Sequence, residues 1–181
     1  MILKKILSLA ASTISIFIII LFYSNSNAEE NNIKYFSEDL GSLSLMYHRF
    51  DENKYPSTNI RMEVFKQQLN EIEKEKIEFI TFSKFEKIIK NNIEKNYLLL
   101  TIDDGFKSFY INAWPILKKK KIPFILFIST REVGKYGYMT WEEIKEISSN
   151  EFATIGNHSH THEYLIDWDE QKIINDIKTS I

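Results

Sequence analysis

Apolar residues along this chain fall into short, nearly continuous runs that alternate with longer amphipathic segments. The runs predict buried β-strands at residues 43–47, 97–103 and 123–130, a strand of alternating character at 77–82 and a short strand at 151–156. The amphipathic segments have helical spacing and predict α-helices at residues 61–76, 84–92, 108–121, 140–147 and 169–181. Apolar strands that alternate with helices are typical of a parallel sheet covered by helices. The pattern therefore predicts an α/β fold.

Local signals refine some of these elements. Thr140 precedes Glu143 by three residues, which predicts a capping box at a helix start. Ser83 is expected to cap the helix that follows it, and Pro115 is expected to kink its helix or to lie in the first turn. Five strand–helix units are fewer than the eight of a closed barrel of about 250 residues. We therefore expect one domain, with either an open sheet or an incomplete barrel.

The first 28 residues do not fit this pattern. Lys4 and Lys5 precede an apolar run from Ile6 to Phe22, and Ser26 and Ala28 follow it at the spacing of a cleavage site. This arrangement is typical of a secretory signal, and the length of the run makes an uncleaved membrane anchor the alternative. We expect a signal or anchor over 1–28, a polar lead-in over 29–42 and the folded domain over 43–181. The protein is then exported to the periplasm, the cell surface or the medium.

Composition narrows the function classes. Because Lys4 and Lys5 are the only charged residues before position 29, residues 29–181 keep 21 of the 23 basic residues and all 25 acidic ones, a formal charge of −4. Nucleic-acid binding proteins usually carry a basic surface, so we expect no nucleic-acid partner. The chain has no cysteine, which excludes disulfides, zinc–thiolate sites and cysteine nucleophiles. Core packing must stabilise the exported domain.

Candidate catalytic residues cluster at the predicted strand ends. His48 follows the first strand, Asp103 and Asp104 end the third, and the chain's other three histidines follow the last. Parallel α/β folds build their sites at the carboxyl ends of strands. Neighbouring strand residues point to opposite faces, so Asp103 and Asp104 can share a site only where the chain turns, and Gly105 permits that turn. An ordinary Asp–Gly turn without function is the alternative.

The histidines of "HSHTH" have spacings that suit a metal. His158 and His162 could reach one ion if the loop folds over itself, and His158 and His160 could do so on an extended segment. Two imidazoles and one carboxylate make a hydrolytic zinc site with an open position. A solvated loop with incidental metal affinity is the alternative, which the nearby aspartate pair disfavours.

Other residues have weaker signals. His48 is a candidate general acid because of its place at a strand end. Trp114, Trp141 and Trp168 are expected in the core. In the "KYGYM" loop, Tyr136 or Tyr138 is a candidate for lining a sugar cleft.

Two of these motifs together resemble a known family. "TIDDG" resembles the TFDDG motif of the polysaccharide deacetylases, the NodB-homology or carbohydrate esterase family 4 proteins, and "HSHTH" fits their H-[ST]-x-x-H motif. The flanking segments are also similar, from about Leu43 to the chain end, and "LMYHRF" resembles the poly-N-acetylglucosamine deacetylase branch. The resemblance implies a distorted (β/α) barrel that removes N-acetyl groups from a sugar polymer.

The resemblance also implies roles for single residues. Asp104, His158 and His162 would bind a divalent metal, with zinc expected. Asp103 would be the general base and His48 the general acid. His160 occupies a free position of the motif and is not expected to be a ligand. The implied partner is an N-acetylated polysaccharide, with membrane attachment through the N-terminal apolar segment as an option.

The chain departs from the family pattern at its end. Ile181 follows soon after the histidines, before the family's later motifs, which include an arginine that orients the base. We therefore expect a barrel that is incomplete at the C-terminus. A catalytically inactive exported remnant that binds metal or glycan is one rival interpretation. Another is a different metallohydrolase, because His158-x-His160 resembles the HxH motif of amidohydrolases, although that motif usually follows an early strand.

Overall fold

The computed structural model describes residues 41–90 and 95–181, all within one compact unit that spans Asp39–Ile181. The predicted signal or anchor, most of the polar lead-in and the end of the helix predicted at 84–92 lie outside the described residues. Within the described ranges, no helix combines the length and the apolar character needed to cross a bilayer.

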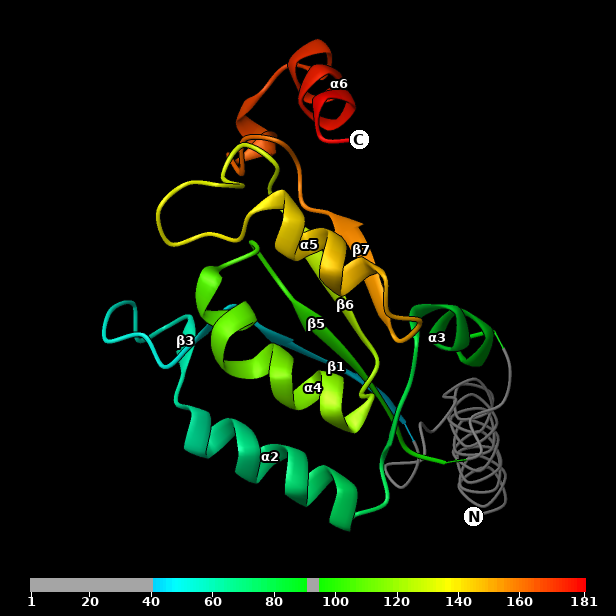
Figure 1. The fold of residues 1–181 in the computed structure, drawn as a ribbon. Coiled ribbons are helices and arrows are strands. Elements are labelled where there is room, and N and C mark those ends of the chain that lie inside the picture. Colours follow the sequence, from blue (N-terminus) through cyan, green and yellow to red (C-terminus); the bar gives the residue numbers. More distant parts are fainter. Residues whose placement is uncertain (1–40, 91–94) are drawn as a thin grey trace, which may run out of the picture. The chain divides into compact units, whose positions relative to one another are not determined.

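The fold is a mixed α/β structure built on a five-stranded parallel sheet (Figure 1). Its main path runs in the order β1-β5-β6-β7, and β4 pairs with the first two residues of β5. A second, two-stranded parallel sheet joins β2 to β3. The strands are β1 (Ser42–Tyr47), β2 (Arg49–Phe50), β3 (Asn59–Ile60), β4 (Glu78–Phe79), β5 (Tyr97–Ile102), β6 (Phe124–Ile128) and β7 (Ala153–Asn157).

Helices follow the strands in the predicted alternation (Figure 1). They are α2 (Met62–Lys74), α3 (Phe82–Ile88), the π-helical turn η2 (Phe109–Ala113), α4 (Trp114–Lys120), α5 (Trp141–Ser148), the 3-10 turn η3 (Leu165–Asp167) and α6 (Glu170–Thr179).

Side chains of the central strand pack alternately on the two faces of the sheet. Leu98, Leu100 and Ile102 join the larger core cluster, to which α2, α4 and α5 also contribute buried side chains. Tyr97 and Leu99 belong to the smaller cluster, which α3 helps to cover. All six residues of β5 are buried. The two clusters therefore fix the end of β5 from both faces of the sheet.

The structure confirms some local predictions and corrects others. The capping box of Thr140 and Glu143 is present, and Pro115 lies in the first turn of α4, directly after η2. The prediction for Ser83 is wrong. The helix starts earlier, at Phe82, and Thr81 caps it by accepting a hydrogen bond from the Lys84 N–H at 3.3 Å. The strand predicted at 77–82 is reduced to Glu78–Phe79 for the same reason.

The tryptophans divide between core and surface. Trp114 is buried and packs edge-on against Phe124. Trp141 is 55% exposed, which corrects the prediction that it lies in the core. It is the first residue of α5, where only Ile144 and Ile147 are buried. Trp168 is half-buried, with the Lys172 ammonium 3.8 Å above its ring.

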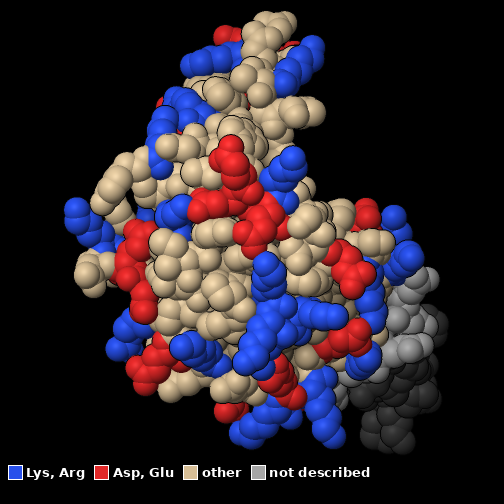
Figure 2. All heavy atoms as spheres, viewed as in Figure 1, with Lys and Arg blue, Asp and Glu red and all other residues tan. Residues whose placement is uncertain are grey.

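Charged side chains of both signs are interspersed over the face that carries α2, α4 and α5 (Figure 2). Several form ion pairs between elements, such as Lys118 with Glu146 at 2.8 Å and Lys120 with Glu73 at 2.6 Å. Exposed pairs of this kind add little to stability, because water and salt screen the charges. The apolar clusters beneath them therefore dominate the stability of the fold.

Candidate metal centre and active site

The predicted functional residues directly follow strands that lie side by side in the parallel sheet. His48 is the residue after β1, Asp103 the residue after β5, and His158 the residue after β7. Because β1 pairs with β5, and β6 joins β5 to β7, these carboxyl ends lie at one edge of the sheet. The fold thus brings residues more than a hundred positions apart into one region.

A tight turn lets both aspartates face this region. Asp103 still continues the sheet, since its N–H donates to the Tyr47 carbonyl at 2.9 Å. Asp104 and Gly105 then adopt left-handed conformations, with φ of 72° and 76°. A Cβ at Gly105 would lie only 2.9 Å from the Ile128 side chain, so both φ and space favour glycine there. The left-handed φ of Asp104 is tolerated by aspartate better than by most residues.

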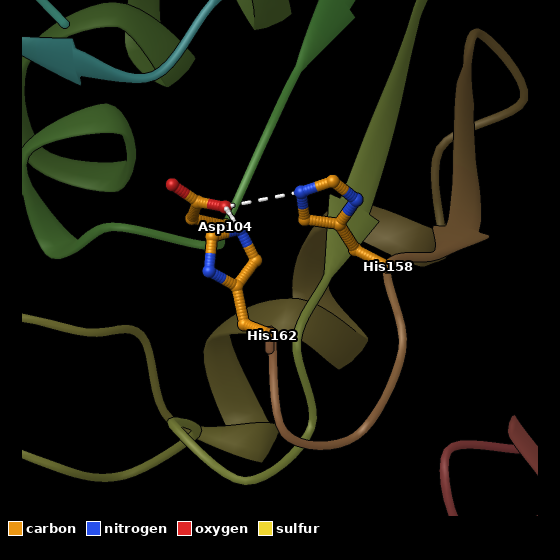
Figure 3. A group of neighbouring side chains, drawn as sticks. All are labelled: Asp104, His158 and His162. Carbon is orange, nitrogen blue, oxygen red and sulfur yellow. Dashed lines mark ion pairs between the residues drawn. The ribbon is translucent and has the colours of Figure 1, made fainter. Parts of the chain in front are cut away.

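Asp104 meets two imidazoles (Figure 3). Its Oδ1 lies 3.2 Å from His158 Nε2 and 3.0 Å from His162 Nε2. One ligand atom from each of the three residues lies within 4.8 Å of the others. The exposed side-chain fraction is 11% for Asp104, 33% for His158 and 53% for His162. The cluster is therefore closed on the carboxylate side and open to solvent on the histidine side.

Buried carboxylate oxygens show that this cluster suits a cation. Asp103 Oδ1 is buried without a hydrogen-bond partner among the described residues, and the equally buried Asp104 Oδ1 is approached by the two imidazole nitrogens. A buried carboxylate oxygen without such a partner is costly unless a cation or a proton compensates it. A carboxylate with two neutral imidazoles and an open side is a typical donor set of hydrolytic zinc sites. The residues present thus fit a divalent metal.

The histidine loop folds back on itself and selects two of its three histidines. Ser159 and His162 have left-handed φ of 65° and 58°, and Ser159 Oγ accepts from the His162 N–H at 3.1 Å. His160 instead lies with its Nδ1 2.9 Å from Thr130 Oγ1. The structure therefore brings His158 and His162 to Asp104 and directs His160 to a different neighbour.

Electrostatics separate the two aspartates. Burial raises the pKa of the Asp103 carboxyl above its ordinary value, despite the opposing effect of His158 and His48. Burial acts on Asp104 too, but the imidazoles of His158 and His162 outweigh it and hold the pKa of that carboxyl below its ordinary value. The Asp104 carboxylate in turn raises the pKa of His158. Neighbouring carboxyls whose pKa values are pushed apart are typical of an acid–base residue beside a ligand.

A pocket of about 480 Å³ opens beside the cluster. His48, Asp104 and His162 lie in its wall, together with Phe106 and Tyr138. The two aromatic rings are 4.9 Å apart. Tyr138 is thus the residue of the "KYGYM" loop that lines a cleft, whereas Tyr136 is fully exposed.

Arg49 stiffens the same pocket. Its guanidinium lies 3.5 Å from the centre of the Phe106 ring and 4.3 Å from that of Tyr55. Its Nη1 donates to Thr58 Oγ1 at 2.9 Å, and its Nε lies 3.3 Å from Glu52. The planar group thus contacts two aromatic rings, one hydroxyl and one carboxylate.

Comparison with known proteins identifies the family. The family model for polysaccharide deacetylase matches residues 90–181, which contain both aspartates and all three loop histidines. The chain belongs to the polysaccharide deacetylase family. Its NodB-type relatives include a poly-β-1,6-N-acetyl-D-glucosamine N-deacetylase of Staphylococcus epidermidis, which is 26% identical over 157 residues. That match covers 77% of this chain and 54% of the relative, so the chain spans about half the length of that deacetylase.

Solved deacetylase structures share the fold. IcaB from Ammonifex degensii superposes with a TM-score of 0.66 at 28% identity, over 78% of this chain and 66% of that one. The Streptococcus pyogenes deacetylase PplD, solved in complex with acetate, gives a TM-score of 0.67 at 24% identity, over 76% of this chain and 64% of its own. At that identity PplD supports the fold alone.

Sequence reasoning missed the residues that hold the histidine loop. Ser129 Oγ donates to the His158 carbonyl at 2.9 Å, and the Arg131 N–H donates to the His160 carbonyl at 3.0 Å. Asp176, on α6, accepts from the backbone of the loop. Ser129 and Arg131 immediately follow the end of β6, a position that could have marked them. Asp176 lies inside an ordinary amphipathic pattern and gave no signal.

Proposed function

We propose that this chain is a metal-dependent deacetylase that removes N-acetyl groups from an N-acetylglucosamine-containing polysaccharide outside the cytoplasm. The observation that carries the proposal is the convergence of Asp104, His158 and His162 beside the buried, unpaired oxygen of Asp103. Membership of the deacetylase family and the printed substrate of the staphylococcal relative support the substrate class.

Asp104, His158 and His162 would hold the metal, and their donor set favours zinc. When bound, such an ion acts as a Lewis acid that polarises an amide carbonyl and lowers the pKa of water. The open histidine side of the cluster leaves room for substrate and water. The pocket with Phe106 and Tyr138 offers aromatic surface to a sugar ring next to the cluster.

Asp103 would be the general base. Burial raises the pKa of its carboxyl, which makes the carboxylate a stronger base than an exposed aspartate. Its Oδ1 has no hydrogen-bond partner among the described residues and can accept a proton. As water attacks the acetamide carbonyl, one O–H bond breaks and that proton moves to Asp103. His48, in the wall of the same pocket, would give a proton to the nitrogen as the C–N bond breaks. The products are acetate and a free glucosamine unit.

The fold and location of the protein are also part of the proposal. The parallel sheet would belong to a distorted (β/α) barrel of the NodB type, a proposal that membership of the deacetylase family supports. Residues 1–28 would direct export as a signal or an anchor. N-terminal sequencing of the protein from its host would give Glu29 as the first residue if the signal is cleaved, and Met1 or its neighbour if it is an anchor.

The activity is tested by incubating the full chain, supplied with zinc, with a β-1,6-linked N-acetylglucosamine oligomer and measuring acetate and free amine together. Matched Asp104→Ala protein is the control, and a β-1,4-linked oligomer tests linkage. We expect acetate and amine in equal amounts from the wild type only. Zinc binding without release from either oligomer would refute the deacetylase proposal and favour the non-catalytic remnant.

The variant His48→Ala tests the role of the general acid separately from that of the general base. The metal ligands and Asp103 remain, so we expect zinc binding to persist while deacetylation falls by about 10²-fold or more. Full activity in the variant would remove His48 from the mechanism.

A further inference from the structure

Helix α6 is attached to the fold in an unusual way. Among its ten residues, all of which the structure describes, Asp176 alone is buried, at 6% exposed. Its isoleucines at 173, 174 and 177 are only half-buried. An amphipathic helix normally buries apolar side chains first, and a carboxylate is rarely buried without partners. The position of Asp176 therefore calls for a specific role.

The partners of Asp176 are backbone groups of the histidine loop. Its Oδ2 accepts from the His160 N–H at 2.8 Å, and its Oδ1 accepts from the Thr161 N–H at 3.0 Å. Hydrogen bonds to an ionised carboxylate are stronger than those between neutral groups. Both donors lie in the stretch between His158 and His162, so the carboxylate grips the backbone that joins the two candidate ligands.

The opposite side of the loop is bound by the end of β6. Ser129 and Arg131 hold the carbonyls of His158 and His160, as described above, and the Thr130 N–H donates to the Ser159 carbonyl at 3.3 Å. The end of β6 thus fixes three carbonyls of the loop, and α6 fixes two of its N–H groups. Such fixing is needed because left-handed φ at Ser159 and His162 each costs on the order of 1 kcal/mol or more.

We propose that Asp176 is a positioning residue of the metal centre, which sets metal affinity by holding the loop backbone so that His158 and His162 face Asp104. Asp176 touches neither imidazole ring through these bonds and acts only through the loop. Its role rests on the proposed metal site. It also makes the docking of α6 and the binding of metal mutually dependent, because the same two hydrogen bonds serve both.

The test is zinc affinity of the full chain, measured by competition with a chromophoric chelator. Asp176→Asn keeps the size of the side chain but turns an amide NH₂ group toward one of the loop N–H donors. We expect affinity to fall about 10- to 100-fold, the usual effect of losing a partner that orients ligands. Asp169→Asn is the matched control, because it removes the same charge from the N-cap of the same helix, where Asp169 accepts from the Lys172 N–H at 2.8 Å. We expect the control to bind zinc as the wild type does.

Rescue and hydrogen exchange distinguish positioning from a loss of folding. Asp176→Glu retains both oxygens and the charge, and α6 buries no other residue that would resist a small shift, so this variant should recover most of the affinity. In Asp176→Asn, the His160 and Thr161 amides should lose exchange protection while the amides of β5 keep theirs.

Three results would overturn the inference: unchanged affinity in Asp176→Asn, an equal loss in Asp169→Asn, or protected His160 and Thr161 amides in Asp176→Asn. A wild-type chain that binds no zinc would be a different result, since it would refute the proposed function and this role with it.

Discussion

The two halves of the candidate site are held by different forces. Asp103 and Asp104 extend from β5, whose six residues are all buried between two apolar clusters. His158 and His162 extend from β7, which pairs only with β6 among the described residues and has exposed side chains at Thr154, Ile155 and Asn157.

This difference shows how a fold can build one site from unequal parts. Hydrophobic packing on both faces of β5 fixes the position of the turn that carries Asp103 and Asp104. The histidine loop has little apolar packing and depends on hydrogen bonds from Ser129, Arg131 and Asp176. Apart from the candidate ligand Asp104, substitutions in the first region should therefore act through stability or chemistry, and substitutions in the second through metal affinity.

The largest effect is expected at the base. Asp103→Asn removes the proton acceptor but preserves shape, so deacetylation should fall by about 10²- to 10⁴-fold. Zinc affinity should persist, because the three candidate ligands are untouched. Acetate release and chelator competition on the same preparation measure both quantities. More than a tenth of wild-type turnover in the variant would show that Asp103 is not the base.

A pair of substitutions, one in each strand, compares β5 and β7 directly. Leu100 in β5 is fully buried, and Leu100→Ala should lower the free energy of unfolding by about 2–5 kcal/mol. Ile155 in β7 is 37% exposed, and Ile155→Ala should lower it by about 1 kcal/mol. Urea titrations with equal slopes give both values. Equal losses would mean that β7 is packed as firmly as β5.

Alkaline pH should weaken the β1–β5 region through Tyr47. Burial raises the pKa of Tyr47 from 10.0 to about 12. The folded state therefore keeps the phenol proton longer than the unfolded state does. This contribution to stability is fully present below pH 10 and is lost as pH rises through about 12. In thermal unfolding from pH 9 upward, the melting temperature of the wild type should fall more steeply with pH than that of Tyr47→Phe. The comparison uses the slope with pH, because the loss of the hydrogen bond to Gln68 lowers the stability of the variant at every pH below the pKa.

The smallest effect is expected at His160. Its ring contacts Thr130 rather than Asp104, so His160→Ala should weaken zinc binding by at most about tenfold. His162→Ala should abolish the site, because Nε2 of that residue lies beside Asp104. The reverse order of losses would favour the HxH arrangement of amidohydrolases.

Much of this arrangement was predictable from the sequence, and the exceptions have physical causes. Continuous apolar runs predicted β5 and β6 well, because strands buried on both faces need such runs. The run at 43–47 does form a strand, β1, but the prediction that it is buried is wrong, since Leu43 is 59% and Met46 56% exposed. Spacing left the histidine pair open, and the resemblance to the deacetylase motif predicted that His158 and His162 would meet Asp104, as they do in the structure. The short β4 could not be predicted, because its pairing to two residues of β5 depends on where α3 begins.

Long-range polar contacts were the hardest feature to predict. In the sequence, Asp176 looks like a solvent-facing residue of an amphipathic helix. Only the structure shows that α6 packs against the histidine loop and that Asp176 binds its backbone. Nothing local distinguishes it from Asp169, whose role as an N-cap follows from position alone. Similarly, Trp141 looked like a core residue by type, but the first turn of α5 leaves it at the surface.

The most direct test of the account is a calorimetric zinc titration of the full chain, with Asp104→Ala and His158→Ala as paired controls from the two halves. We predict one saturable site in the wild type and none in either variant, because both halves supply ligands to the same ion. Binding that survives in either variant, or a wild type without a saturable site, would contradict the conclusion that β5 and β7 jointly build a metal centre.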